Sequence, residues 1–153
     1  AWALSHQLIG ATAWTFSSEE SVGQLDHLIV DEAGQCSLAN LAAMSPSAKN
    51  IVLLGDQMQL DQVTQGSHPG KSGLSCLSFY LEDHATIPPE RGIFLHLTRR
   101  MRPEICSFIS ETVYEDRLKS HDCTSERELS IKGNIPLIRQ ASGTTSRYAA
   151  GTT

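Results

Sequence analysis

Two short runs of aliphatic residues stand out in the hydrophobic pattern of this chain. They cover residues 27–30 and 50–54, and an aspartate follows each of them closely, Asp31 and Asp56. Continuous rather than alternating apolar residues are typical of strands that are buried on both faces of a parallel sheet. Residues 37–44, between the two runs, have helical character, and a serine-proline pair is expected to end that helix. The pattern therefore predicts a β-α-β unit.

Weaker periodicity along the rest of the chain predicts several further elements. The Gln- and Gly-rich stretch after the second run is expected to be a loop, and the small, polar residues 140–153 a frayed tail. A helix that starts at Pro103 would have an apolar face made of Ile105, Phe108, Ile109 and Val113. The other predicted elements are a strand around residues 8–14, a short helix at residues 74–81 and a strand at residues 93–97.

Charge is distributed unevenly along the chain. The 153 residues are 40% hydrophobic, which is enough for a packed core in one domain or in the adjoining parts of two. The net charge is −5, but residues 1–90 hold ten acidic and two basic residues, whereas residues 91–153 hold seven acidic and ten basic ones. This change of sign, beside a pair of prolines, predicts a domain boundary. We expect a first domain at residues 1–89, the start of a second at 90–139 and a disordered tail at 140–153.

Neither a membrane segment nor an export signal is expected. No apolar run approaches the roughly 18 residues of a membrane span, and the first residues lack a basic stretch followed by an apolar one. The four cysteines, Cys36, Cys76, Cys106 and Cys123, lack the close spacing of a zinc or redox site. Free, mostly buried thiols and a cytoplasmic location are therefore expected.

An acidic pair, Asp31 and Glu32, directly follows the first predicted strand. Ligands of open α/β sheets bind at the carboxyl ends of the strands. Adjacent carboxylates at such an edge suit Mg²⁺ and water, with one holding the metal and the other polarising the attacking water. Taken alone, the pair fits a solvated strand end better than a metal site, because acidic pairs are common at such ends.

The second predicted strand leads into Gly55, Asp56 and Gln59. The glycine allows backbone to approach a ligand closely, and the amide of Gln59 can span two phosphate or water oxygens. The alternative is an ordinary turn between a strand and a helix.

Three arginines, Arg99, Arg100 and Arg102, connect the strand predicted at residues 93–97 to the helix that starts at Pro103. Guanidinium groups suit the spread negative charge of a phosphoryl group in transfer. The alternatives are a solvated basic turn, or arginines that pair with the acidic first part of the chain.

Taken together, the three segments resemble motifs II, III and IV of superfamily 1 helicases. The matching segments are Asp-Glu-Ala-Gly-Gln at 31–35, Gly-Asp-Gln-Met-Gln-Leu at 55–60 and Arg-Arg-Met-Arg-Pro at 99–103. Their order and spacing are similar to the up-frameshift-like branch. The connecting residues 65–70 and 84–92 look similar to bacterial proteins that join such a helicase to a RecB-like nuclease. The resemblance implies an α/β fold with a parallel sheet, part of a RecA-like P-loop NTPase.

The resemblance also implies roles for single residues. Asp31 would help to hold Mg²⁺, and Glu32 would activate the attacking water. Gln59 would sense the γ-phosphate, and Arg100 would be an arginine finger from the second RecA-like domain. Further contacts are expected from Gln35, Asp56 and Arg99 to the nucleotide and from Thr12 to single-stranded nucleic acid; a buried strand end is an equally open role for Thr12.

The chain departs from the family pattern at several points. Arg99 stands where an aromatic residue usually stacks on adenine, and Arg102 replaces a histidine. Residues 61–62 replace a proline-containing turn. No Gly-x-x-x-x-Gly-Lys-Ser/Thr segment occurs, so the chain by itself is expected not to hydrolyse ATP, because nothing would cradle the phosphates.

The expected function is that of a fragment of an ATP-dependent helicase or translocase acting on DNA or RNA. The expected cofactors are ATP and Mg²⁺. The expected partner is single-stranded DNA or RNA, with a RecB-like nuclease domain in the same parent chain as a further expectation. Two alternatives stay open: a truncated, catalytically inactive module, and a P-loop ATPase that does not act on nucleic acid.

Overall fold

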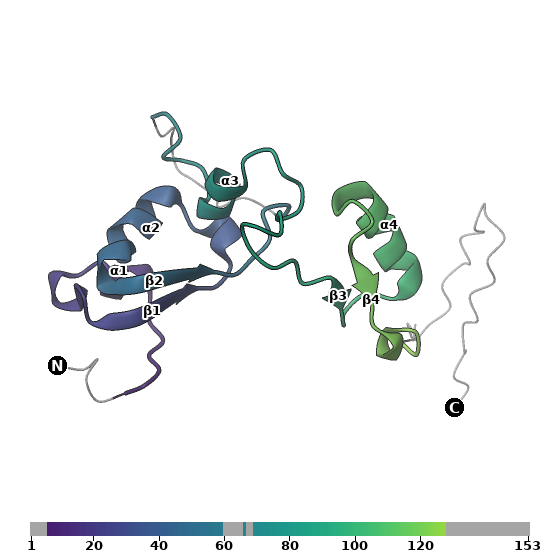
Figure 1. The fold of residues 1–153 in the computed structure, drawn as a ribbon, viewed down its shortest axis with the longest axis horizontal. Helices are drawn as coiled ribbons and strands as arrows, with labels where there is room; N and C mark the ends of the chain where they lie inside the picture. The colour runs from purple at the N-terminus through teal and green to yellow at the C-terminus, as the bar shows by residue number, and fades with distance from the viewer. Residues whose placement is uncertain (1–5, 60–65, 67–68, 128–153) are drawn as a thin grey trace, which may run out of the picture. The chain divides into compact units, whose positions relative to one another are not determined.

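The computed structural model describes residues 6–59, 66 and 69–127 of the chain (Figure 1). The chain forms two compact units. The first comprises Ala1–Phe94 together with Val113–Glu115, and the second comprises Leu95–Thr112 together with Asp116–Thr153. The expected division into two RecA-like domains at residue 89 stays a prediction, and the tail expected at 140–153 lies outside the described residues.

The predicted β-α-β unit is present in the first unit. Strand β1 (Leu25–Val30) and strand β2 (Ala48–Leu53) pair in parallel, in a register that places Val30 beside Leu53. Helix α2 (Leu38–Met44) connects them. It begins at Ser37, whose hydroxyl accepts a hydrogen bond from the backbone N–H of Asn40, and it ends in the 3₁₀ turn η4 (Ser45–Ser47), which contains the expected proline.

The strand predicted around residues 8–14 is absent. Helix α1 (Ala13–Phe16) begins there instead and is followed by the 3₁₀ turn η2 (Glu19–Ser21). Phe16 is buried in the core, whereas Leu8 and Trp14 are exposed, so the apolar residues of this segment do not line one strand face. The 3₁₀ turn η3 (Ala33–Gln35) follows β1, and helix α3 (Cys76–Leu81) forms within the range predicted for it.

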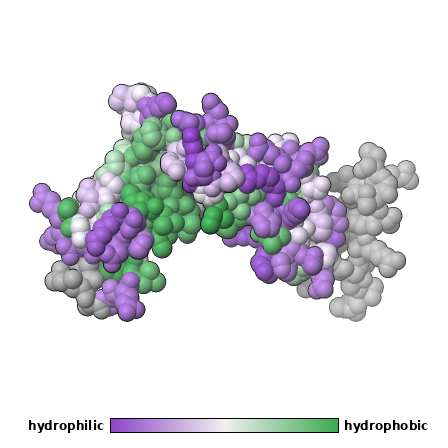
Figure 2. All heavy atoms as spheres, viewed as in Figure 1, coloured by the Kyte–Doolittle hydropathy of each residue, from purple (hydrophilic) through white to green (hydrophobic). Residues whose placement is uncertain are grey.

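The core of the first unit lies on one face of the two-stranded sheet. It consists of Phe16, Leu28, Val30, Ala33, Met44, Cys76 and Leu77. The expectation that both faces of the strands are buried is wrong for the described residues. Ile29 is 57% exposed and its partner Val52 is 41% exposed, because the described helices cover only the other face. Figure 2 shows apolar surface gathered over this part of the first unit.

The second unit is built around helix α4 (Pro103–Val113), which starts at the predicted proline. Strands β3 (Leu97–Thr98) and β4 (Lys119–Ser120) form a short parallel pair, and the 3₁₀ turn η5 (Asp122–Thr124) follows. Of the strand predicted at 93–97, only residue 97 lies in a strand of the described chain. That strand, β3, pairs with β4 over two residues.

The apolar face predicted for α4 is not its buried face. Cys106 and Ser110 are buried, whereas Ile105 is 54% and Phe108 66% exposed. The hydroxyl of the buried Ser110 accepts a hydrogen bond from the backbone N–H of Leu118 at 3.0 Å, which ties the helix to the segment leading into β4. The helix therefore packs through small side chains.

The four cysteines are free thiols, as expected, although Cys36 is only half-buried and Cys123 is exposed. None of the helices in the described part of the chain has the length and apolarity that a membrane crossing requires.

Candidate nucleotide-hydrolysis site

The parallel pairing of β1 and β2 brings the first two predicted motif segments to one edge of the sheet. The ladder continues past the strands, because the N–H of Leu54 donates to the carbonyl of Val30 at 2.9 Å. The N–H of Ala33 then donates to the carbonyl of Leu54 at 2.8 Å. The loop that follows β1 and the loop that follows β2 are therefore joined backbone to backbone.

Two glycines allow these loops to lie against each other. A Cβ atom on Gly34 would lie 2.4 Å from the carbonyl oxygen of Asp56, so no other residue fits without movement of the backbone. Gly55 has a φ of +152°, and a Cβ there would lie 2.8 Å from the amide nitrogen of Ala33. The sequence suggested that Gly55 allows backbone to approach a ligand, whereas in the structure it allows one loop to approach the other.

The predicted catalytic carboxylates lie at this edge with exposed side chains. Glu32 adopts a left-handed backbone conformation (φ 51°, ψ 44°), which is uncommon for a residue other than glycine. Its N–H donates to Oδ1 of Asp31 at 3.0 Å, and this bond accompanies the sharp turn from the strand into η3. Gln35 closes that turn through its N–H, which donates to the carbonyl of Glu32 at 2.8 Å, and the side chain of Gln35 is exposed.

These residues have the oxygen donors that Mg²⁺ prefers. No group of three His, Cys, Asp or Glu side chains that would hold a metal by itself occurs in the described ranges. Mg²⁺ keeps several waters and is usually held by one or two carboxylates together with substrate phosphates. The adjacent, exposed carboxylates of Asp31 and Glu32 fit that mode of binding.

Asp56 is turned toward donors within the protein. Its Oδ1 accepts a hydrogen bond from the N–H of Met58 at 2.9 Å. Its Oδ2 accepts one from the hydroxyl of Tyr114 and a long one, at 3.5 Å, from Nε2 of Gln59. Gln59 itself is exposed. The predicted contacts of Asp56 and Gln59 with a nucleotide stay predictions.

Helix α3 supports the loop after β1 from the core side. The buried thiol of Cys76 donates to the carbonyl of Ala33 at 3.1 Å, and the N–H of Cys76 donates to the carbonyl of Cys36 at 2.8 Å. Burial raises the pKa of Cys76 to about 11. At neutral pH this group is a protonated thiol with a structural role and is not a nucleophile.

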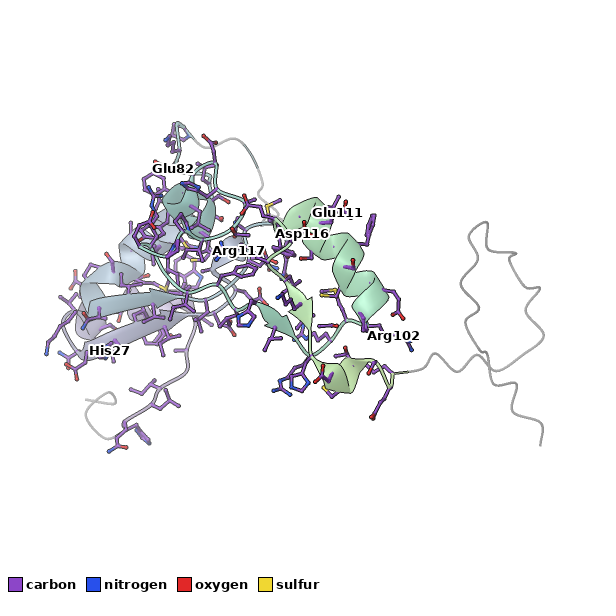
Figure 3. The ribbon with its side chains drawn as sticks, turned by 45° about the vertical axis from the view of Figure 1, so that its right-hand side comes forward. His27, Glu82, Arg102, Glu111, Asp116 and Arg117 are labelled. Carbon is purple, nitrogen blue, oxygen red and sulfur yellow. The ribbon has the colours of Figure 1, made fainter. Side chains whose placement is uncertain are left out.

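The predicted arginines lie in the second unit, where Arg99 and Arg100 are exposed between β3 and α4. The guanidinium of Arg127 donates to the backbone carbonyl of Arg99 at 2.8 Å and to that of Arg100 at 3.1 Å. Arg102, at the start of α4 (Figure 3), pairs with Glu104 at 3.3 Å and also donates to the carbonyl of Arg127. The hydrogen bond from Arg102 lowers the pKa of Glu104.

The structure thus gathers Asp31, Glu32, Gln35, Asp56 and Gln59 along the two joined loops of the first unit.

Thr12 is not on a strand end as expected. It precedes α1 as an exposed N-cap residue whose side chain makes no capping hydrogen bond.

Sequence reasoning missed three residues of this arrangement. Gly34 belongs to the segment Asp-Glu-Ala-Gly-Gln at 31–35, and a glycine in such a segment could have been predicted to lie close to neighbouring backbone. Tyr114 lies 58 residues from Asp56, and Arg127 lies 28 and 27 residues from Arg99 and Arg100. Neither Tyr114 nor Arg127 belongs to a recognised segment.

Comparison with known proteins agrees with this fold. Residues 3–65 match the family described as AAA domain. Together with the parallel β-α-β unit, this match identifies the first unit as part of a RecA-like, P-loop NTPase fold of the α/β class. No solved structure matches the chain.

Several proteins, two of them named as helicases, are similar to the chain over most of its length. It is 32% identical to the DNA replication ATP-dependent helicase/nuclease DNA2 of Gallus gallus over 118 residues, which is 76% of this chain and 11% of that protein. It is 34% identical to the ATP-dependent helicase upf1 of Schizosaccharomyces pombe over 101 residues, 65% of this chain and 11% of that protein. A Drosophila melanogaster homolog of regulator of nonsense transcripts 1 is 28% identical over 105 residues, 68% of this chain and 9% of that protein.

The chain thus spans about a tenth of the length of these relatives. The matches indicate a fragment that is like the superfamily 1 helicases.

Proposed function

We propose that this chain is part of an ATP-dependent helicase or translocase that acts on DNA or RNA. The observation that carries the proposal is the joining of the loops after β1 and β2, which places Asp31, Glu32 and Gln59 along one edge of a parallel sheet. The relatives support it, since two of the matched proteins are named as ATP-dependent helicases.

In this proposal each residue of the edge has a separate task. Asp31 helps to hold Mg²⁺ together with water, and Glu32 polarises the attacking water. Gln59 contacts the γ-phosphate through its amide, and Gln35 and Asp56 support the nucleotide site. Mg²⁺, when bound, would neutralise charge on the phosphate oxygens. The exposure of Asp31, Glu32 and Gln59 suits contact with a ligand that enters from solvent.

The second unit contributes the arginines. Arg100 is proposed as an arginine finger and Arg99 as a contact to the base, in place of the stacking aromatic residue of the family. Their side chains are exposed while Arg127 holds their backbone carbonyls, so the guanidinium groups stay available to a phosphate or a base.

The finer assignment follows the resemblance of the motifs. We place the parent protein in the up-frameshift-like branch, with single-stranded DNA or RNA as its partner and Thr12 as one contact. A RecB-like nuclease in the same parent chain and a cytoplasmic location complete the proposal. One of the relatives is itself named as a helicase/nuclease.

The direct test replaces Glu32 in the full-length protein. We expect Glu32→Gln to leave ATP binding nearly unchanged and to lower turnover by roughly 10²–10⁴, the usual contribution of a general base. Steady-state ATP hydrolysis and equilibrium ATP binding, each with and without single-stranded DNA or RNA, are the measurements. Glu19→Gln, at an exposed position of η2 in the same unit, is the matched control and should behave as the unaltered protein.

The same assays distinguish the alternatives. Loss of affinity and rate together would assign Glu32 a structural role at the strand end. Hydrolysis that no nucleic acid stimulates would indicate an ATPase that acts on something else. A full-length protein without any hydrolysis would be the inactive module.

A further inference from the structure

Tyr114 is the residue that joins the loop after β2 to a distant part of the chain. It directly follows α4, and residues Val113–Glu115 pack with the first unit. The hydroxyl of Tyr114 donates a hydrogen bond to Oδ2 of Asp56. Its ring lies against that of Phe94, with the centroids 6.1 Å apart and the planes tilted by 46°. The phenol is therefore held at both its ring and its hydroxyl.

Neighbouring contacts fix the same region. The hydroxyl of Thr86 donates to Oε2 of Glu115, the residue after Tyr114. Nε2 of Gln57 donates to the carbonyl of Ala85 at 2.6 Å, which ties the residue after Asp56 to the residue before Thr86. The loop after β2, the segment at 84–86 and the residues after α4 thus form one hydrogen-bonded group within the first unit.

Asp56 in turn holds the residues that follow it in the loop. Its two carboxylate oxygens bind the N–H of Met58 and, more weakly, the amide of Gln59. A hydrogen bond between a phenol and a carboxylate is charge-assisted and stronger than one between neutral groups. Without the phenol, the amide of Gln59 would be the remaining donor to Oδ2 of Asp56 within the described part of the chain, and the carboxylate would draw that amide toward the loop.

We propose that Tyr114 is a positioning residue that, by holding the carboxylate of Asp56, sets the place of the Gln59 amide for contact with the γ-phosphate. The inference rests on the proposed function, because the role of Gln59 does. Burial, and then the hydrogen bond with Asp56, raise the pKa of Tyr114 to about 12. The phenol therefore remains a hydrogen-bond donor throughout the neutral range.

The test measures kcat and KM for ATP in the full-length protein with single-stranded nucleic acid. Tyr114→Phe keeps the ring against Phe94 and removes only the hydroxyl. We expect it to lower kcat by roughly 10- to 100-fold, as misplacement of a catalytic group does, with KM changed by less than about threefold. Tyr80→Phe is the matched control in the same unit, because the hydroxyl of that exposed tyrosine makes only a long bond, at 3.5 Å, to the carbonyl of Arg91. Its kcat should stay unchanged.

A cycle with Gln59 separates positioning from a merely structural role. In a Gln59→Ala background, Tyr114→Phe should lower kcat no further, because the group that Tyr114 positions is gone. An unchanged kcat in Tyr114→Phe, or an equal loss with and without Gln59, would overturn the inference.

Failure of the proposed function would be seen separately, because the unaltered protein would then hydrolyse no ATP. In that case the hydrogen bond between Tyr114 and Asp56 is tested by stability instead. Urea unfolding is measured for Tyr114→Phe, Asp56→Asn and the double variant. Coupled unfolding midpoints would support the hydrogen bond, and additive ones would overturn the inference.

Discussion

Gly34 is where two loops that are separate in the sequence meet most closely. The carbonyl oxygen of Asp56 occupies the place that a Cβ of residue 34 would need. Any side chain there must push the loop after β1 away from the loop after β2. Together with Gly55, Gly34 thus allows the loop of Glu32 and the loop of Gln59 to lie against each other.

We expect Gly34→Ala to lower the free energy of unfolding by about 1–3 kcal/mol, the usual cost of overpacking, because the atom in the way is backbone. Gly10→Ala is the matched control, since nothing lies within 4 Å of a Cβ at that position, and it should cost nothing measurable. Urea unfolding of the two variants checks this. Equal stability of both would mean that the loops separate without cost.

At the scale of elements, the sheet of the first unit has one packed and one exposed face. Leu28 and Ile29 are neighbours in β1 and point to opposite faces, with 3% and 57% of their surfaces exposed. Two aliphatic residues of nearly equal size therefore lie in very different surroundings.

Replacing each of the two residues by alanine should show which face of the sheet contributes more to stability. Leu28→Ala removes a side chain from the core cluster and should lower the free energy of unfolding by about 2–5 kcal/mol. Ile29→Ala should cost less than about 1 kcal/mol, because its side chain is already in contact with solvent. The comparison is made by chemical denaturation. A larger loss at Ile29 would show that its face is packed in solution.

Local signals in the sequence predicted the elements whose causes are local. The serine-proline pair marked the end of α2, and Pro103 marked the start of α4, so these helices were correctly predicted. The two apolar runs correctly predicted the parallel strands β1 and β2, because this signal is also local. The strand around residues 8–14 and the buried face of α4 were wrong, because both depend on which neighbours cover a segment.

The site was predictable to the same extent. Asp31, Glu32 and Gln59 were proposed because their residue types and spacing match a known pattern, and their catalytic roles stay predictions. The contacts of Tyr114 and Arg127 depend on the path of the chain between distant residues, and no spacing in the sequence encodes that path.

At the scale of the whole molecule, a motor must make hydrolysis depend on the closure of its two domains, so one catalytic group is expected from the second domain. Arg100 is the candidate, with an exposed side chain and a backbone held by Arg127. An arginine that acts only in the transition state contributes to rate and little to ground-state binding. We therefore expect Arg100→Ala in the full-length protein to lower turnover by roughly 10³-fold or more, with ATP affinity little changed.

The neighbouring arginines provide the matched comparison for that experiment. Arg102 is paired with Glu104 and bonded to the carbonyl of Arg127, so Arg102→Ala should affect stability more than turnover. Arg99→Ala should mainly weaken ATP binding, if its guanidinium stacks in place of the aromatic residue. Turnover and ATP affinity measured on the three variants separate these roles. Turnover that survives in Arg100→Ala and is abolished in Arg102→Ala would show that the motif is aligned wrongly, with the catalytic arginine at position 102.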